Sequence, residues 1–172
     1  MKCYVLQVMT NKEIKVRNAL IKIGIKALVP REDRLIHTNG KWTTKEYVLF
    51  VGYVFVFIDF TPEKYYKIKD IDGIIKFLGF NGNLPIPISE AEIGFINTMA
   101  PDENPLQPSD VIISNGKVFV VNGALKTLKT FLDKEQSHIK FNLHSKRAKV
   151  PLSVLGVNRT VNLSFNIVSE NN

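Results

Sequence analysis

Three prolines within eight residues divide the chain into two segments whose hydrophobic patterns differ. Acidic and amide residues surround these prolines, which are Pro101, Pro105 and Pro108. Proline cannot continue a helix or donate a hydrogen bond to a sheet, and the polar residues gain nothing from burial. We therefore predict an N-terminal domain over residues 1–100, a linker over residues 101–109 and a C-terminal domain over residues 110–172.

Strand and helix signals alternate in the first half of the N-terminal segment. Residues 4–9 are apolar and rich in strand formers. Thr10 and Glu13 then form a capping-box pattern, which favours a helix that ends at Gly24. The sequence therefore opens with a predicted strand and a predicted helix.

The second half of this segment continues the alternation. Asn39 and Gly40 indicate a tight turn between two strands, and Thr61 and Ser89 are predicted helix caps. A further strand is expected over residues 74–78. This order predicts an α+β fold with a split βαβ, ferredoxin-like sheet that has its helices on one face.

The C-terminal segment has a different character, because short β-rich runs are separated by turn residues and no convincing helix stands out. Such a pattern over so few residues predicts a small all-β barrel. The expected strands cover residues 111–114, 117–121, 139–143, 148–155 and 161–168.

The chain carries a net charge of +7 over 172 residues. A basic balance favours a nucleic acid, an acidic membrane surface or an acidic protein partner, although a solvated lysine face gives the same count. Cys3 is the only cysteine, so no disulfide can form within the chain, which fits a reducing cytoplasm. The longest apolar run, residues 48–58, has eleven residues, whereas a membrane helix needs about 20. We expect a cytoplasmic protein without membrane association.

Known catalytic and metal-binding motifs do not occur in the sequence. His37, His138 and His144 follow no metal-ligand spacing. There is also no nucleophile elbow, phosphate-binding loop or dinucleotide fingerprint. We therefore predict a protein that is not an enzyme and that binds no metal and no cofactor.

The most informative segment is the aromatic strand expected within residues 49–58. Successive side chains of a strand point to opposite faces, so Tyr53, Phe55 and Phe57 share one face and aliphatic residues share the other. If helices cover the aliphatic face, the aromatic face needs another cover. That cover is either the loops and prolines around residues 81–88 or a binding partner, since aromatic residues are common interface anchors.

Several segments of the N-terminal part resemble, in order, the N-terminal domain of the NusG family of transcription elongation factors. The aromatic segment is similar to the family signature Phe-Pro-Gly-Tyr-Val-hydrophobic-Val, although Val51 replaces the proline and Cys3 stands where a tryptophan is usual. The other matches resemble the first strand, the second strand and the segment before the last helix of the family's N-terminal domain. The four matching segments are residues 4–8, 29–32, 49–56 and 85–89.

The C-terminal part resembles the KOW domain of the same family, a five-stranded barrel. Ala124 replaces an expected proline, Thr127 and Thr130 stand where the KOW turn has glycines, and residues 131–137 are extra. Threonine resists backbone conformations that glycine adopts, so the loop after the first strand should differ from the family's shape. The matching segments are residues 117–126, 144–150 and 155–163.

The resemblance implies a function in transcription. Family N-terminal domains bind the clamp helices of RNA polymerase through a hydrophobic patch and promote processive elongation or antitermination. KOW domains recruit a second partner, which is a termination factor, a ribosomal protein or RNA. The altered loop and the basic charge resemble those of specialised paralogues of the LoaP and RfaH kind. We expect the protein to be a monomer. On the matching positions, the polymerase patch comprises Tyr4, Phe50, Tyr53 and Phe55.

Basic residues also predict RNA binding by the C-terminal part, where nine lysines and arginines stand against four acidic residues from position 108 onward. Two alternatives remain open at this point. The basic residues could form a solvated face, or the chain could be a stand-alone RNA-binding or ribosome-associated KOW protein without polymerase binding. The predicted RNA-binding residues are Lys126, Lys129, Lys146, Arg147 and Lys149.

Overall fold

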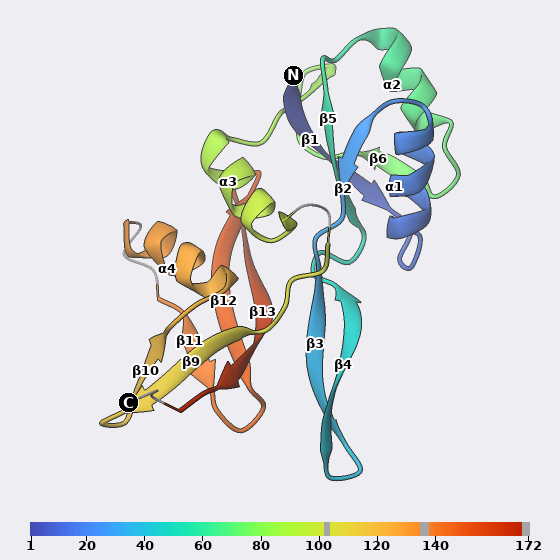
Figure 1. The fold of residues 1–172 in the computed structure, drawn as a ribbon. Helices are drawn as coiled ribbons and strands as arrows, with labels where there is room; N and C mark the ends of the chain where they lie inside the picture. Colours follow the sequence, from blue (N-terminus) through green and yellow to red (C-terminus); the bar gives the residue numbers. More distant parts are fainter. Residues whose placement is uncertain (102–103, 135–137, 170–172) are drawn as a thin grey trace.

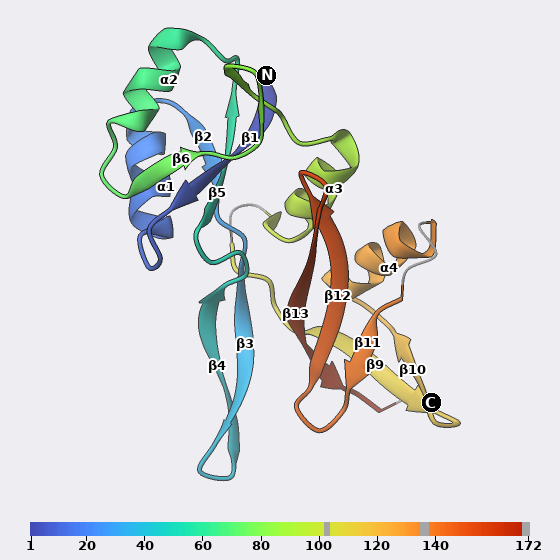
Figure 2. The same ribbon diagram turned by 180° about the vertical axis from the view of Figure 1, so that it is seen from behind.

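The computed structural model of the chain describes residues 1–101, 104–134 and 138–169 (Figure 1). Helices and strands are mixed, so the predicted α+β class is confirmed. A four-stranded sheet and a five-stranded sheet lie in different parts of the molecule, and a long hairpin extends from the first part alongside the second (Figures 1 and 2).

The N-terminal sheet is antiparallel throughout and has the order β2-β5-β1-β6. Helices α1 and α2 cover one of its faces (Figure 1). The elements are β1 (Lys2–Val8), α1 (Glu13–Lys22), β2 (Lys26–Leu28), β5 (Tyr53–Ile58), α2 (Pro62–Lys69) and β6 (Ile74–Phe77).

The two faces of β5 belong to two different hydrophobic cores. Val54, Val56 and Ile58 pack beneath α1 and α2, whereas Phe55 belongs to the core on the opposite face of the sheet. Tyr53 and Phe57 are partly buried against that second core. The alternation predicted from the sequence is therefore confirmed.

Two of the three predicted helix caps are present. The Thr61 hydroxyl accepts from the Lys64 amide at the start of α2, and Ser89 and Glu92 form a complete capping box at α3 (Glu90–Thr98). The capping box predicted at Thr10 and Glu13 is wrong. Lys12 is the N-cap of α1 without a side-chain cap, because the Glu13 carboxylate instead accepts from the Gly52 amide at 2.7 Å.

The long hairpin consists of β3 (Arg31–Thr38) and β4 (Lys41–Val48). Asn39 and Gly40 form its turn with φ angles of 51° and 76°. Both residues lie in the left-handed region that a two-residue turn of this kind requires, so the predicted turn is confirmed. A smaller hairpin, β7 (Phe80–Asn81) and β8 (Leu84–Pro85), precedes α3.

The segment predicted as a linker is anchored to the hairpin. The Leu106 amide donates to the Arg31 carbonyl, and the Leu106 carbonyl accepts from the Asp33 amide, both at 2.8 Å. Leu106 is also buried. Part of this segment, residues 102–103, lies outside the described residues.

The C-terminal sheet has five strands in the order β10-β9-β13-β12-β11, in which only the β9–β13 pair is parallel. The five runs predicted from the sequence correspond to these strands. They are β9 (Ser109–Ser114), β10 (Lys117–Val120), β11 (Lys140–Asn142), β12 (Arg147–Val154) and β13 (Val157–Ile167).

The expectation that this part lacks helices is wrong, because α4 (Ala124–Lys134) follows β10 (Figure 1). Its leucines at positions 125, 128 and 132 are fully buried in the core. The Leu125 amide at the start of the helix donates to the Ser109 hydroxyl at 3.1 Å. The turn predicted there from the KOW resemblance is thus a helix, and residues 135–137 of the extra segment lie outside the described residues.

Across the described residues, no helix is long and apolar enough to span a membrane. The same residues contain no group of three or more histidine, cysteine, aspartate or glutamate side chains placed to hold a metal ion.

Candidate functional site

The aromatic face of β5 lies opposite α1 and α2. Phe55 is fully buried there, and its ring meets the ring of Phe50 edge-on with the centroids 5.3 Å apart. Phe50 comes from the loop between β4 and β5, and Tyr53 begins the strand. These three residues, which we call the aromatic patch, therefore form one continuous apolar surface.

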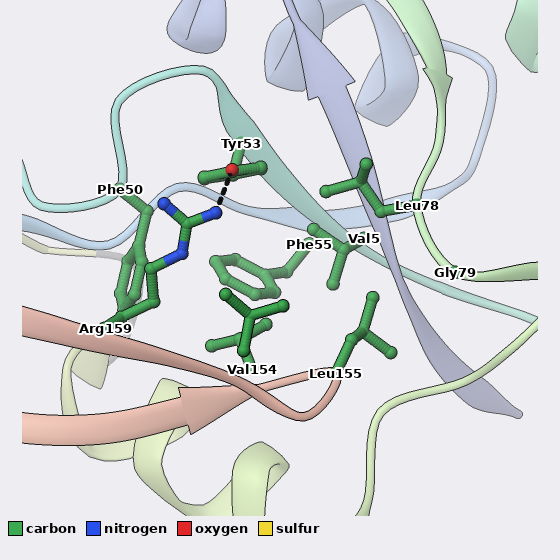
Figure 3. Close-up of a pocket in the computed structure, with 10 residues that line it drawn as sticks. Val5, Phe50, Tyr53, Phe55, Leu78, Gly79, Val154, Leu155 and Arg159 are labelled. Atoms are coloured by element: carbon green, nitrogen blue, oxygen red, sulfur yellow. Dashed lines mark hydrogen bonds between the residues drawn. The ribbon is translucent and has the colours of Figure 1, made fainter.

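The turn between β12 and β13 covers the aromatic patch (Figure 3). We call residues 154–159, which form this turn and its ends, the β12–β13 tip. A cavity of about 260 Å³ remains between the patch and the tip. Besides the aromatic patch, its lining comprises Val5, Leu78, Gly79, Val154, Leu155, Val157 and Arg159.

Two polar contacts hold the tip over the patch. The Arg159 guanidinium donates to the Tyr53 hydroxyl and lies 5.0 Å from the centre of the Tyr53 ring (Figure 3). The Leu155 amide donates to Glu92, the same residue that caps α3, at 2.6 Å. The tip is thus tied both to β5 and to α3.

Gly79 provides the space into which the Leu155 side chain fits. A Cβ added at Gly79 would lie 3.2 Å from Leu155 Cδ1, which is closer than an ordinary van der Waals contact. Gly79 also has a φ of +68°, where a side chain would be strained. The apolar end of the tip therefore depends on a glycine in the N-terminal part.

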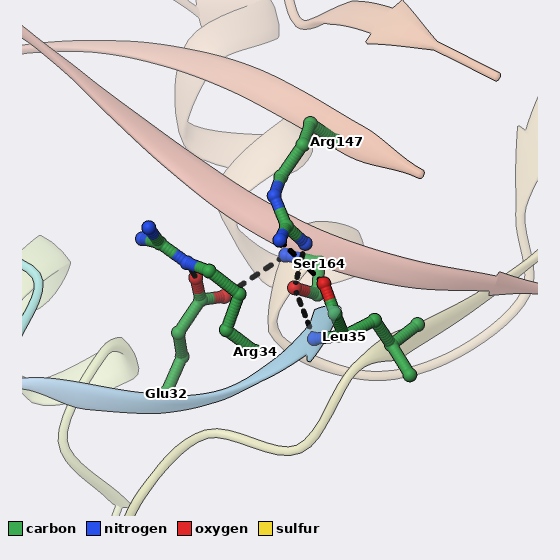
Figure 4. Close-up of polar contacts among 5 residues, drawn as sticks. All are labelled: Glu32, Arg34, Leu35, Arg147 and Ser164. Atoms are coloured by element: carbon green, nitrogen blue, oxygen red, sulfur yellow. Dashed lines mark hydrogen bonds and ion pairs between the residues drawn. The ribbon is translucent and has the colours of Figure 1, made fainter. Parts of the chain in front are cut away.

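A second set of contacts, which we call the polar clasp, joins β3 to β12 and β13 (Figure 4). Glu32 is 2% exposed and accepts from the Ser164 amide at 2.9 Å. The Ser164 hydroxyl accepts from the Leu35 amide at 3.1 Å, and Arg147 donates to both the Ser164 hydroxyl and the Leu35 carbonyl. Arg34 pairs with the other oxygen of Glu32. Each buried polar group of the clasp therefore has a partner.

Three of the four residues predicted for the polymerase patch lie together. Phe50, Tyr53 and Phe55 all line the cavity beneath the tip. Tyr4 does not join them, because it is buried on the other face of the sheet against Phe60 and Phe77. Burial raises the pKa of Tyr4 above its ordinary value, and the nearby Asp59 adds to this shift.

The residues predicted to bind RNA do not form one surface. Lys126 and Lys129 are exposed on α4. Lys149 is exposed on β12, and Lys146 lies over the Trp42 ring of the hairpin at 4.4 Å. Arg147 is part of the polar clasp, where burial lowers its pKa and the Glu32 carboxylate opposes that shift.

Sequence reasoning did not find the residues that hold the two parts together. Glu92 lies three residues after the predicted cap Ser89, and Arg159 is one of the nine basic residues from position 108 onward. Glu32 lies among polar residues, a pattern typical of a solvated carboxylate. The contacts by which these residues join the two parts span 63 positions for Glu92, 106 for Arg159 and 132 for Glu32, so local patterns carried no signal for them.

Comparisons with known proteins agree on one family. Residues 1–97 match the family model described as "NusG: Transcription termination factor nusG". The chain is 25% identical to the protein named transcription termination/antitermination protein NusG of Buchnera aphidicola over 178 aligned residues, which cover 98% of the chain and 95% of that protein. It is 27% identical to the protein of the same name from Helicobacter pylori, over 79% of the chain and 74% of that protein.

A solved structure shows the same fold. The structure described as "Domain interaction in Thermotoga maritima NusG" matches with a TM-score of 0.55, covering 95% of this chain and 93% of that one. Sequence identity between the two is 20%, so this likeness concerns the fold.

Proposed function

This chain belongs to the NusG family of transcription factors, and from that premise we propose that it binds RNA polymerase through the aromatic patch. Binding at the clamp helices would promote processive elongation or antitermination in the cytoplasm, with the protein acting as a monomer. The C-terminal part would recruit a second partner, either RNA or a protein such as a ribosomal protein or a termination factor.

The observation that carries this proposal is the way in which the aromatic patch is covered. Phe50 and Phe55 are buried, yet a cavity of about 260 Å³ separates the patch from the β12–β13 tip. Protein interiors are normally packed with few voids larger than a water molecule. Aromatic residues around an apolar hollow are instead typical of anchors for a binding partner.

Polymerase binding at this patch requires the tip to move away. The tip and a partner helix would occupy the same side of β5, because Tyr53 and Phe55 face the tip directly (Figure 3). The structure therefore corresponds to a closed form, and the proposed function needs an open form in which the aromatic patch is exposed.

Arg159 is the residue at which closure can be weakened without altering the patch itself. Its side chain is exposed and its contacts with Tyr53 are a hydrogen bond and a cation–π contact. Exposed contacts of this kind are worth about 0.5–1 kcal/mol each. Arg159→Ala should therefore favour the open form modestly while leaving Phe50, Tyr53 and Phe55 in place.

A pair of variants tests the proposal. Arg159→Ala should raise the affinity for core RNA polymerase, because it releases the tip. In that background, Tyr53→Ala should lower the affinity by about 2 kcal/mol, or about 30-fold, because it removes an interface anchor. Binding can be measured by fluorescence anisotropy, and readthrough of a terminator in a reconstituted transcription assay gives the functional result.

Tyr66→Ala is the matched control, since Tyr66 is 62% exposed on α2 and lies away from the aromatic patch. Circular dichroism should show that all variants are folded. If folded Arg159→Ala/Tyr53→Ala binds polymerase as tightly as Arg159→Ala, the patch does not bind polymerase. If no variant binds polymerase, the alternative of an RNA-binding or ribosome-associated protein takes its place.

A further inference from the structure

We infer that the outer half of the β3–β4 hairpin and the β11–β12 turn together form a binding surface for single-stranded RNA. This inference extends the proposed role in transcription. It rests on that role only for the choice of RNA as the ligand. The surface is separate from the aromatic patch, and it combines charge, an exposed aromatic pair and hydroxyl groups.

Two segments that lack acidic residues supply the charge. Residues 34–45 contain Arg34, Lys41 and Lys45 without a carboxylate, and residues 138–149 contain three lysines and Arg147 without a carboxylate. The acidic residues of the hairpin lie at its base, where each already has a partner. Glu32 contacts Arg34 and Ser164, Asp33 accepts from Gln107, and Glu46 pairs with Arg31.

The fold brings these two segments together. The Lys146 ammonium group, in the β11–β12 turn, lies 4.4 Å from the centre of the Trp42 ring in β4. The polar clasp fixes this arrangement, because Arg147 holds the Leu35 carbonyl of the hairpin (Figure 4). Two basic segments about a hundred residues apart in the sequence thus border one surface, which suits a polyanion.

Trp42 and His37 provide a place for bases to stack. They face each other across the hairpin, with ring centroids 5.0 Å apart, and His37 is exposed. Trp42 remains 39% exposed although Lys146 contacts it. A tryptophan that served only to close the two parts of the molecule would be buried, whereas an exposed ring beside lysines is typical of sites that stack unpaired bases.

The opposite face of the hairpin carries further groups for the backbone of an RNA strand that crosses the edge of β4. Lys41, Thr43 and Lys45 are all exposed, and alternation places them together on the face of β4 opposite Trp42. The lysines can neutralise successive phosphates, and the Thr43 hydroxyl can pair with a ribose 2′-hydroxyl, which DNA lacks. The combination therefore favours RNA.

The test measures binding of the full chain to a labelled single-stranded RNA of about 12 nucleotides by fluorescence anisotropy. Trp42→Leu keeps an apolar side chain but removes the stacking surface, and it should weaken binding about tenfold or more. Lys41→Gln/Lys45→Gln and Lys146→Gln/Lys149→Gln should each flatten the log–log salt dependence by about 1.4, since each contact on a single strand contributes about 0.7.

The control is Lys126→Gln/Lys129→Gln, which removes the same charge from α4 and should leave the affinity and the salt dependence nearly unchanged. Single-stranded DNA of the same sequence should bind more weakly than RNA. The inference is overturned if the α4 control weakens binding as much as the two other pairs, if DNA binds as tightly as RNA, or if the wild type binds no RNA at low salt.

Polymerase binding separates this inference from the proposed function. Trp42→Leu leaves the aromatic patch intact and removes one contact between the two parts of the molecule, so it should bind core RNA polymerase at least as tightly as the wild type. A protein that binds polymerase but not RNA would contradict only the inference. A protein that binds RNA through Trp42 but never binds polymerase would contradict only the proposed function.

Discussion

Cys3 is buried in the core between the N-terminal sheet and α3, where its backbone carbonyl accepts from the Ile88 amide. Burial raises the pKa of its thiol to about 12, and the Glu92 carboxylate contributes in the same direction. The thiol therefore stays protonated in the folded protein over a pH range in which the thiol of the unfolded chain, with an ordinary pKa of 9.0, ionises.

This difference predicts a loss of stability at alkaline pH. Between about pH 9 and pH 12 the unfolded chain has released the Cys3 proton and the folded protein has not, so the free energy of unfolding falls as the pH rises. Urea denaturation at pH 8 and pH 10 should show a larger decrease for the wild type than for Cys3→Ala. An identical decrease in both proteins would show that the Cys3 thiol ionises equally well when folded.

The residues of the aromatic patch could be chosen from the sequence because strand alternation is a local rule. It placed Tyr53 and Phe55 correctly on one face of β5. Tyr4 was grouped with them by resemblance, and alternation within β1 puts it on the opposite face from Val5, which lines the cavity. The tip residues that meet the patch, such as Arg159, could not be found, because the contact with Tyr53 spans 106 positions.

At the scale of elements, α4 had a usable local signal that the interpretation of the sequence missed. Leu125, Leu128 and Leu132 stand at the i, i+3 and i+7 spacing of a buried helical stripe. The short β-rich runs on either side outweighed this stripe, and the later likeness to a KOW domain added a turn at the same place. The hairpin turn at Asn39 and Gly40 was predicted correctly, because its signal lies entirely within two residues.

The packing of α4 predicts a clear change in stability. Leu128→Ala removes a fully buried side chain from the core and should lower the free energy of unfolding by about 2–5 kcal/mol. The adjacent Thr127 is exposed, so Thr127→Ala should change it by less than about 0.5 kcal/mol. Urea denaturation of both variants measures this. Equal stabilities would mean that α4 does not pack as the structure shows.

For the whole molecule, the important feature is that the two parts share a core. The core on the aromatic face includes Phe55 and Phe95 from the N-terminal part together with Leu128 and Phe165 from the C-terminal part. The rings of Phe95 on α3 and Phe131 on α4 lie 5.2 Å apart. Such packing depends on how the N-terminal and C-terminal parts dock against each other. The hydrophobic periodicity within either part does not encode that docking.

The connection between the two parts is short. Leu106 is hydrogen-bonded to β3, and Ser109 already begins β9, so only Gln107 and Pro108 lie between the two anchors. Inserting about eight glycine and serine residues after Gln107 should weaken closure about tenfold through loop entropy. Polymerase affinity should rise by up to the same factor, as measured by anisotropy. An unchanged affinity would indicate that closure does not oppose polymerase binding.

This two-residue tether makes the β12–β13 tip an intramolecular ligand with a very high effective concentration at the aromatic patch. The closed fraction is therefore independent of the concentration of the protein. Producing more of the protein would raise the number of open molecules in proportion to the total amount of protein. The open fraction would stay the same. A shift toward the open form must come from a molecule that binds it preferentially, and the affinity of that molecule for the open form sets the size of the shift.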